Sequence, residues 1–295
     1  MVDKEKIDIR EIPIIPQVAT KILQMQEENL QISFKELENL ILLDPALTAK
    51  ILKVANSALY ARQREITNLQ QAITLLGFKT IKSLVMLVCA SNLYGKKKGP
   101  RAQANINTIT KVSELSMWRH SVLTAFVGRT IATRLKMEDR KEEVFIAGLL
   151  HDIGRIVLMI NFPEKYDEFL NTISTGKGKN ILSTEENIFG MNHQDVGKYV
   201  LNQWNFPEEL IDTAYFHHTL HVDSKYKNMV SVVGLANIYA KIIAGENITE
   251  NDQYLQDGYM KSLNIDPDLD KYLRENFLSE IEKDDLYLLS SSMFE

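Results

Sequence analysis

Apolar side chains recur at helical spacing along most of this chain, and that pattern constrains the fold more than any other feature. Intervals of three and four residues place apolar groups on one face of an α-helix. Clear examples run through 115–125 and 146–153. Sustained alternation of apolar and polar residues between hairpin turns is not found, so strands should be few or absent. The sequence therefore predicts an all-α fold.

Helix starts are marked by residues that suit an N-cap. Asp44 precedes Pro45, and proline at the first helical position loses no hydrogen bond because its N–H has no partner there in any case. The same pair recurs at Asp266 and Pro267. Ser33, with a glutamate three residues later, has the spacing of a capping box. These signals predict helices that begin at about 34, 45 and 267.

One change of composition suggests how the helices are grouped. The segment "GKKKGPRAQANIN" (95–107) is polar, basic and nearly free of large apolar residues, as expected for a solvated linker. We therefore expect an N-terminal helical lobe over 1–95, a linker over 96–108, a helical bundle over 109–245 and a C-terminal helical extension over 246–295. The lobe should pack against the bundle.

Composition favours a soluble, cytoplasmic protein. The first ten residues are too charged for a signal peptide, and the longest apolar run, "LVMLVCA" (84–90), is far shorter than the ~20 residues of a membrane span. Its Cys89 is the one cysteine of the chain, which excludes an internal disulfide and suggests a buried, inert thiol. The net charge of −5 gives no reason to expect nucleic acid or a membrane as a partner.

The stretch "GLLHDIGRIVL" (148–158) places His151 and Asp152 side by side in an otherwise apolar run. Burying one unpaired polar group costs roughly 2–7 kcal/mol, and burying a charge costs more. The pair therefore needs a partner, which is either a metal ion or a hydrogen-bond network. Neighbouring residues on a helix point about 100° apart, so we expect His151 and Asp152 to lie on either side of a site.

The histidines are concentrated in the predicted bundle. None occurs in the first 119 residues or in the last 74. Widely spaced ligands that helix packing brings together are typical of a metal centre in a helical bundle. Any single histidine is more often an ordinary core or surface residue, and this applies most to His221, which follows a predicted helix end. The adjacent pairs are the better candidates. The six are His120, His151, His193, His217, His218 and His221.

At this point the sequence resembles a known family, the HDOD (HD-related output domain) family. HDOD proteins are a divergent branch of the HD superfamily of metal-dependent phosphohydrolases. The resemblance covers about 10–245. Its motifs, in order, are "IPIIPQVATKIL" (12–23), "LILLDPALTAKILKVANSALY" (40–60), "QAITLLGFKTIKSL" (71–84), "WRHS" (118–121), "VFIAGLLHDIGRIVL" (144–158), "HQDVGKYVLNQWNFP" (193–207) and "VVGLANIYA" (232–240).

The resemblance implies an HD-like bundle over 109–245 and a set of metal ligands. A first metal would take His120, His151 and Asp152, with Asn237 at the position of the superfamily's final ligand. A second metal would add His193, His217 and His218. Imidazole and carboxylate donors suit Fe, Mn, Zn or Ni.

Three departures separate this chain from active relatives. The superfamily has an aspartate where Asn237 stands, and an amide brings no negative charge and bridges two cations poorly. Arg155 replaces a lysine of the cyclic-dinucleotide phosphodiesterase branch. The Gly-Tyr-Pro motif of that branch is missing from "HHTLHVDSKY" (217–226), so phosphodiesterase activity cannot be carried over.

The resemblance also implies a role in bacterial signal transduction. We predict a non-catalytic output or scaffold module that binds signalling proteins. The alternative is a metal-dependent phosphohydrolase acting on a nucleotide or other phosphoester, with Asp152 as its catalytic residue. A third reading is a sensor that binds a nucleotide without turnover. The family's Asn56–Ser57 pair is expected to tie neighbouring backbone groups together.

Overall fold

The protein is built from helices, as the sequence predicts. The computed structural model describes residues 9–25, 30–57, 66–95, 108–175 and 180–293, and it contains no strand within them. The predicted linker falls almost wholly outside these described ranges.

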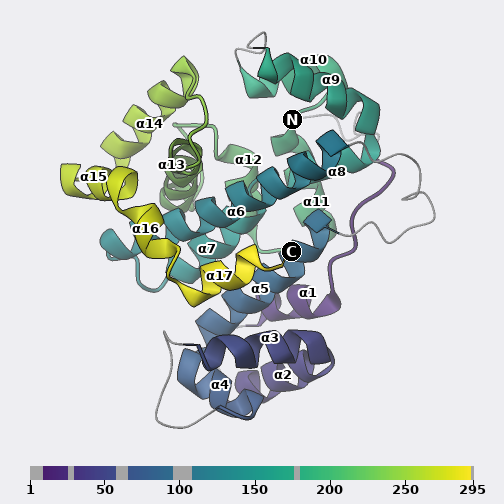
Figure 1. Ribbon diagram of the computed structural model, residues 1–295, viewed down its shortest axis with the longest axis vertical. Coiled ribbons are helices and arrows are strands. Elements are labelled where there is room, and N and C mark those ends of the chain that lie inside the picture. Colours follow the sequence, from purple (N-terminus) through teal and green to yellow (C-terminus); the bar gives the residue numbers. More distant parts are fainter. Residues whose placement is uncertain (1–8, 26–29, 58–65, 96–107, 176–179, 294–295) are drawn as a thin grey trace.

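The first five helices lie toward the bottom of the view in Figure 1, and we refer to them as the N-terminal lobe. Their bounds are α1 Gln17–Gln24, α2 Leu30–Leu42, α3 Pro45–Ala55, α4 Leu69–Leu76 and α5 Phe78–Gly95. Helix α5 packs against α1, α3 and α4 and also against α6 and α7, so it joins the lobe to the bundle.

The following helices form the bundle, with α6 at its centre (Figure 1). Helix α6 packs against α7 and α13, while α11 packs against α8 and α12. The bounds are α6 Thr108–Arg134, α7 Lys141–Leu150, α8 Ile153–Asn161, α9 Pro163–Ser174, α10 Ile181–Phe189, α11 His193–Gln203, α12 Glu208–Phe216 and α13 Lys227–Ile243.

The C-terminal helices cover one side of the bundle and return to the lobe. Helix α14 packs on α13, and α17 contacts α3, α5 and α6 (Figure 1). The indole N–H of Trp118 on α6 donates to the carbonyl oxygen of Ser290 on α17 at 3.0 Å. The bounds are α14 Glu250–Leu263, α15 Pro267–Glu275, α16 Phe277–Ile281 and α17 Asp285–Ser291.

Two of the three predicted helix starts are confirmed. Asp44 caps α3 and Asp266 caps α15, each accepting a hydrogen bond from a backbone N–H in the first turn, with proline at the first helical position. The predicted start at Ser33 is wrong, because α2 begins at Leu30. The residues before Ser33, "LQI", are compatible with a helix and continue it toward the N-terminus.

Of two further expectations for the lobe, that for Cys89 is confirmed, and that for the Asn56–Ser57 pair is confirmed for Asn56 but not for Ser57, whose Oγ is buried without a hydrogen-bond partner. The Asn56 side chain receives a hydrogen bond from the Ile66 N–H at 2.8 Å and donates to the Ile66 carbonyl at 2.7 Å, so it ties the end of α3 to the chain before α4. Cys89 is buried, and burial raises the pKa of its thiol to about 12, which keeps it protonated and unreactive.

No single helix among the described residues is long and apolar enough to cross a membrane. Helices α4 and α5 meet the length and composition criterion only as a pair, and that pair is bent by 113°.

Candidate metal centre

The clustered histidines lie mostly at helix ends rather than within helices. His151 follows the last residue of α7 and Asp152 precedes α8, so the pair occupies the break between two helices. His217 follows the last residue of α12, and His193 is the first residue of α11. The expectation that His151 and Asp152 lie on either side of a site is wrong. At a helix break the 100° rule no longer applies, and both side chains reach one cluster.

Two close helix contacts bring these ends together. A Cβ atom on Gly154 would lie 2.0 Å from the carbonyl oxygen of His193, so only glycine lets α8 approach the start of α11 this closely. A Cβ atom on Gly148 would lie 2.7 Å from the Cα of Ala125, which allows the same close approach between α7 and α6. These contacts place Asp152 beside His193, and His151 beside His120.

The carboxylate of Asp152 lies at the centre of the cluster. Its Oδ1 is 3.4 Å from Nε2 of His193 and 3.5 Å from Nε2 of His217. Its Oδ2 is 3.6 Å from Nε2 of His151 and 3.9 Å from Nε2 of His120. Each carboxylate oxygen therefore faces its own pair of histidines. We call these the Oδ1 face (His193 and His217) and the Oδ2 face (His120 and His151).

Three of these rings have their other nitrogen held by a hydrogen-bond acceptor. Nδ1 of His193 lies 2.6 Å from Oε2 of Glu185. His151 and His217 each place Nδ1 against the carbonyl oxygen three residues earlier, at 2.8 and 3.0 Å. A proton on each Nδ1 satisfies these contacts and leaves each Nε2 with a lone pair. Metal-binding histidines are oriented in this way by their outer partners.

Burial favours the neutral form of four of the imidazoles. It lowers the pKa of His120 to about 3 and that of His151 to about 4, and it also lowers the pKa values of His217 and His218. Burial alone would raise the pKa of Asp152, but the surrounding histidines and Arg155 hold it well below its usual range. The carboxylate of Asp152 thus faces several imidazole nitrogens that carry lone pairs, and few hydrogen-bond donors lie between them. Nε2 of His120 and of His151 are buried without a hydrogen-bond partner.

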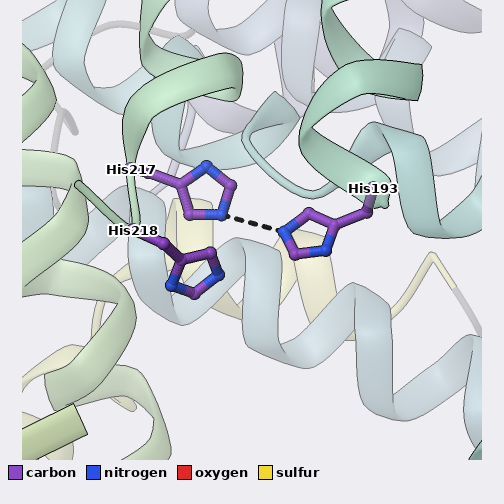
Figure 2. A group of neighbouring side chains, drawn as sticks. All are labelled: His193, His217 and His218. Atoms are coloured by element: carbon purple, nitrogen blue, oxygen red, sulfur yellow. Dashed lines mark hydrogen bonds between the residues drawn. The ribbon is translucent and has the colours of Figure 1, made fainter. Parts of the chain in front are cut away.

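The geometry of the Oδ1 face fits a tetrahedral metal ion. Nε2 of His193 and Nε2 of His217, joined by the dashed line in Figure 2, are 3.3 Å apart, and the two contacts to Oδ1 are 3.4 and 3.5 Å. Ligands at 2.0–2.1 Å from a tetrahedral ion such as Zn²⁺ lie about 3.3–3.4 Å from one another. The three donors therefore already have the spacing that such an ion requires.

His218 is the nearest candidate for a fourth donor on that face. One ring nitrogen from each of His193, His217 and His218 lies within 4.8 Å of the others. The His218 ring lies beside that of His217, with ring centres 4.2 Å apart (Figure 2). The second group of donors in the described part of the chain is His120, His151 and Asp152.

Two charged residues complete the cluster. Glu185, on α10, is fully buried, and its Oε2 also accepts the backbone N–H of His193 at 2.8 Å. Arg155, on α8, has its Nη1 3.2 Å from Oδ2 of Asp152 and its Nε 4.0 Å from Oε1 of Glu185. Sequence reasoning missed Glu185, because nothing local distinguishes it from its neighbour Glu186.

The remaining predicted residues lie as follows. Asn237 is buried on α13, the helix that packs against α6 and α7. His221 is exposed and belongs to neither donor group. A further residue that the sequence did not indicate is Tyr259 of α14, whose hydroxyl donates to the carbonyl oxygen of His217 at 2.9 Å.

Comparison with known proteins agrees with this architecture. The model of the HDOD domain matches residues 12–220, so the chain belongs to the HDOD family. An uncharacterised protein of Treponema pallidum (strain Nichols) is 27% identical over 237 residues, which make up 79% of this chain and 43% of that protein. The chain thus spans less than half the length of this relative.

Solved structures show the same fold. An HDOD domain protein of unknown function from Geobacter sulfurreducens is 23% identical, with a TM-score of 0.72 over 97% of this chain and 94% of that one. A protein of Shewanella amazonensis SB2B, whose name describes it as a suspected phosphohydrolase, is 19% identical, with a TM-score of 0.68 over 97% of this chain and 96% of that one.

Proposed function

We propose that this protein is a regulatory HDOD module that binds a divalent metal ion in its histidine–aspartate cluster and acts by binding signalling proteins, without catalysis. One observation supports the metal site most directly. The carboxylate of Asp152 lies against Nε2 of His193 and Nε2 of His217. These acceptors gain little from facing one another, and a cation between them would satisfy all three.

The number of donors favours a structural ion over a catalytic one. His193, His217, His218 and Asp152 provide four donors, the number found in a closed structural zinc site. A catalytic site keeps one position open for water or substrate. The rings of His193 and His217 are fully buried, and Asp152 is 6% exposed, which leaves little room for a phosphoester.

The ion would join parts of the chain that are distant in sequence. Asp152 precedes α8, His193 begins α11, and His217 and His218 follow α12. An ion held by all of them would fix these helix ends relative to one another, and its binding energy would add to the stability of the bundle. Stabilising the bundle in this way would be enough to explain a metal ion in a module that binds protein partners.

The N-terminal lobe exposes large apolar side chains that a protein partner could cover. Ile14 is 92% exposed, Leu43 is 80% exposed and Leu42 is 53% exposed. Exposed apolar residues of this size are typical of protein-binding surfaces when they gather in one region. The described residues of the lobe contribute no donor to the cluster, so binding a partner there would leave the metal centre intact.

Hydrolysis of a generic phosphodiester tests the non-catalytic assignment. Protein loaded with Zn²⁺, Mn²⁺, Fe²⁺ or Ni²⁺ should hydrolyse bis(p-nitrophenyl) phosphate no faster than the same metal with the Asp152→Ala variant. Turnover by the wild type that disappears in this variant would contradict the proposal.

The second candidate function is metal-dependent phosphohydrolysis. It is favoured by the Oδ2 face, where His120 and His151 provide a second pair of donors on the same carboxylate. Two bound ions could clamp a phosphate and supply hydroxide at neutral pH. If this function is correct, Asn237→Asp should raise the hydrolysis rate by restoring a carboxylate, whereas a scaffold should show no change. Nucleotide binding without product would instead indicate a sensor.

A further inference from the structure

The two faces of Asp152 are not equivalent as metal sites. On the Oδ1 face the three donor separations lie between 3.3 and 3.5 Å. On the Oδ2 face the separations from the carboxylate are 3.6 and 3.9 Å. The ring centres are 5.3 Å apart in both histidine pairs, so the two faces differ in how closely the nitrogens approach the carboxylate. The Oδ1 face is therefore close to the geometry of a bound ion, and the Oδ2 face would have to contract.

A positive side chain already occupies the Oδ2 face. Nη1 of Arg155 donates to Oδ2 of Asp152 at 3.2 Å, whereas Oδ1 lies against Nε2 of His193 and Nε2 of His217. A divalent ion bound to Oδ2 would lie close to the guanidinium group, and like charges repel strongly where water is largely excluded. The side chain of Arg155 is 20% exposed and that of Asp152 is 8% exposed, so solvent screens this repulsion only in part.

The total charge of the cluster also favours a single bound ion. Two carboxyl groups, those of Asp152 and Glu185, and one guanidinium, that of Arg155, lie among the imidazoles. One divalent ion would change a net negative cluster into one with a single positive charge. A second ion would leave a large positive charge in a buried site, which is strongly unfavourable. Asn237, at the position of the last superfamily ligand, is neutral and offers no compensation.

We propose that Arg155 acts as a built-in cation that limits this centre to one divalent ion, bound on the Oδ1 face by His193, His217 and Asp152 with His218 as the fourth donor. This inference rests on the proposed metal-binding function and specifies its stoichiometry. Arg155 is then the residue that separates a one-ion structural centre from a two-ion centre. The unpartnered nitrogens of His120 and His151 do not require an ion, because one water molecule can donate an O–H to each.

Metal counting with Arg155 variants tests this inference. Apo protein without a histidine tag is titrated with Zn²⁺ by calorimetry, and the bound metal is counted by mass spectrometry. The wild type should bind one ion per chain, and both Arg155→Met and Arg155→Gln should bind two. Arg129→Met is a matched control that should stay at one, since Arg129 is 19% exposed and forms its ion pair with Asp284, outside the cluster.

A second pair of variants keeps Arg155 in place, so the test does not depend on folding of the Arg155 variants. His217→Ala should lose the ion, while His120→Ala should retain it with affinity within about threefold of the wild type. A wild type that binds two ions, Arg155 variants that stay at one, or loss of the ion in His120→Ala would overturn the inference. A well-folded wild type that binds no ion would overturn the proposed function itself.

Discussion

The Oδ1 and Oδ2 faces of Asp152 contain the same residue types at similar burial, yet they differ in how firmly the histidines are held. On the Oδ1 face, both rings lie at helix ends, and His193 is held by the buried carboxylate of Glu185. On the Oδ2 face, His120 projects from the body of α6, and Arg155 shares the carboxylate oxygen.

This difference shows that identical ligands do not make identical sites. The hydrogen-bond partners of the histidines determine which ring nitrogens point toward the metal position. The charged side chains nearby determine how many ions the cluster can hold. The predictions below test each part of this contrast.

The largest effect is expected from Asp152→Asn, which removes the charge that both faces share. We expect Zn²⁺ affinity to fall by more than about 100-fold, because losing an outer partner alone commonly costs 10- to 100-fold. Titration calorimetry on apo protein measures it. Asp195→Asn, on the first turn of α11, is the matched control and should bind as the wild type does. An Asp152→Asn variant that binds within tenfold of the wild type would contradict the account.

Glu185→Gln should weaken the Oδ1 face selectively. The amide is a poorer acceptor for the His193 ring, so Zn²⁺ affinity should fall by about 10- to 100-fold. Glu186→Gln is its control, because Glu186 accepts from Asn192 near the same helix start but contacts no histidine in the hydrogen bonds of the described residues. Equal effects of the two variants would show that general packing, and not the orientation of His193, sets the affinity.

The buried histidines predict that the metal-free protein loses stability in acid. The pKa of His120 is about 3 in the folded chain, below its ordinary value of 6.5. Between these values the unfolded chain binds a proton that the folded chain does not. The free energy of unfolding should therefore be highest above pH 6.5 and fall as the pH drops through this window.

Urea unfolding across this pH range provides the measurement. His120→Gln should reduce the slope of unfolding free energy against pH by about 1.4 kcal/mol per pH unit well below pH 6.5, since one fewer proton is taken up on unfolding. An unchanged slope would mean that His120 is protonated in the folded protein.

The smallest effect is expected from Tyr259→Phe. This change removes the hydrogen bond to the His217 carbonyl, which is worth about 0.5–1.5 kcal/mol, so Zn²⁺ affinity should fall by up to about tenfold. Tyr239→Phe is the control, because its hydroxyl is bonded to Asp270 on α15 and not to the histidine turn. It should lower thermal stability without changing the affinity. Equal affinity losses in both variants would remove Tyr259 from the account.

Much of the fold could be predicted from local signals. Asp44 and Asp266 mark helix starts through short-range cap chemistry, which depends on a few neighbouring residues. The metal centre was harder to predict from the sequence. The break between His151 and Asp152 lies in an apolar run without proline, so the sequence resembles one continuous helix.

The outer partners of the histidines could not be predicted at all. Glu185 reaches His193 across the turn between α10 and α11, and Tyr259 reaches His217 from a helix 42 positions later in the chain. Such contacts depend on how helices pack, and no spacing within one helix encodes them. Arg155 was noticed only as a departure from relatives, and its contact with Asp152 emerges from the fold.

The central claim is that the histidine–aspartate cluster binds a divalent ion, and metal content tests it most directly. Untagged wild-type protein and the His151→Ala/Asp152→Ala double variant would be purified side by side and analysed by inductively coupled plasma mass spectrometry. The account predicts near-stoichiometric Zn, Fe, Mn or Ni in the wild type and none in the variant. A folded wild type without metal, or equal metal in both proteins, would contradict it.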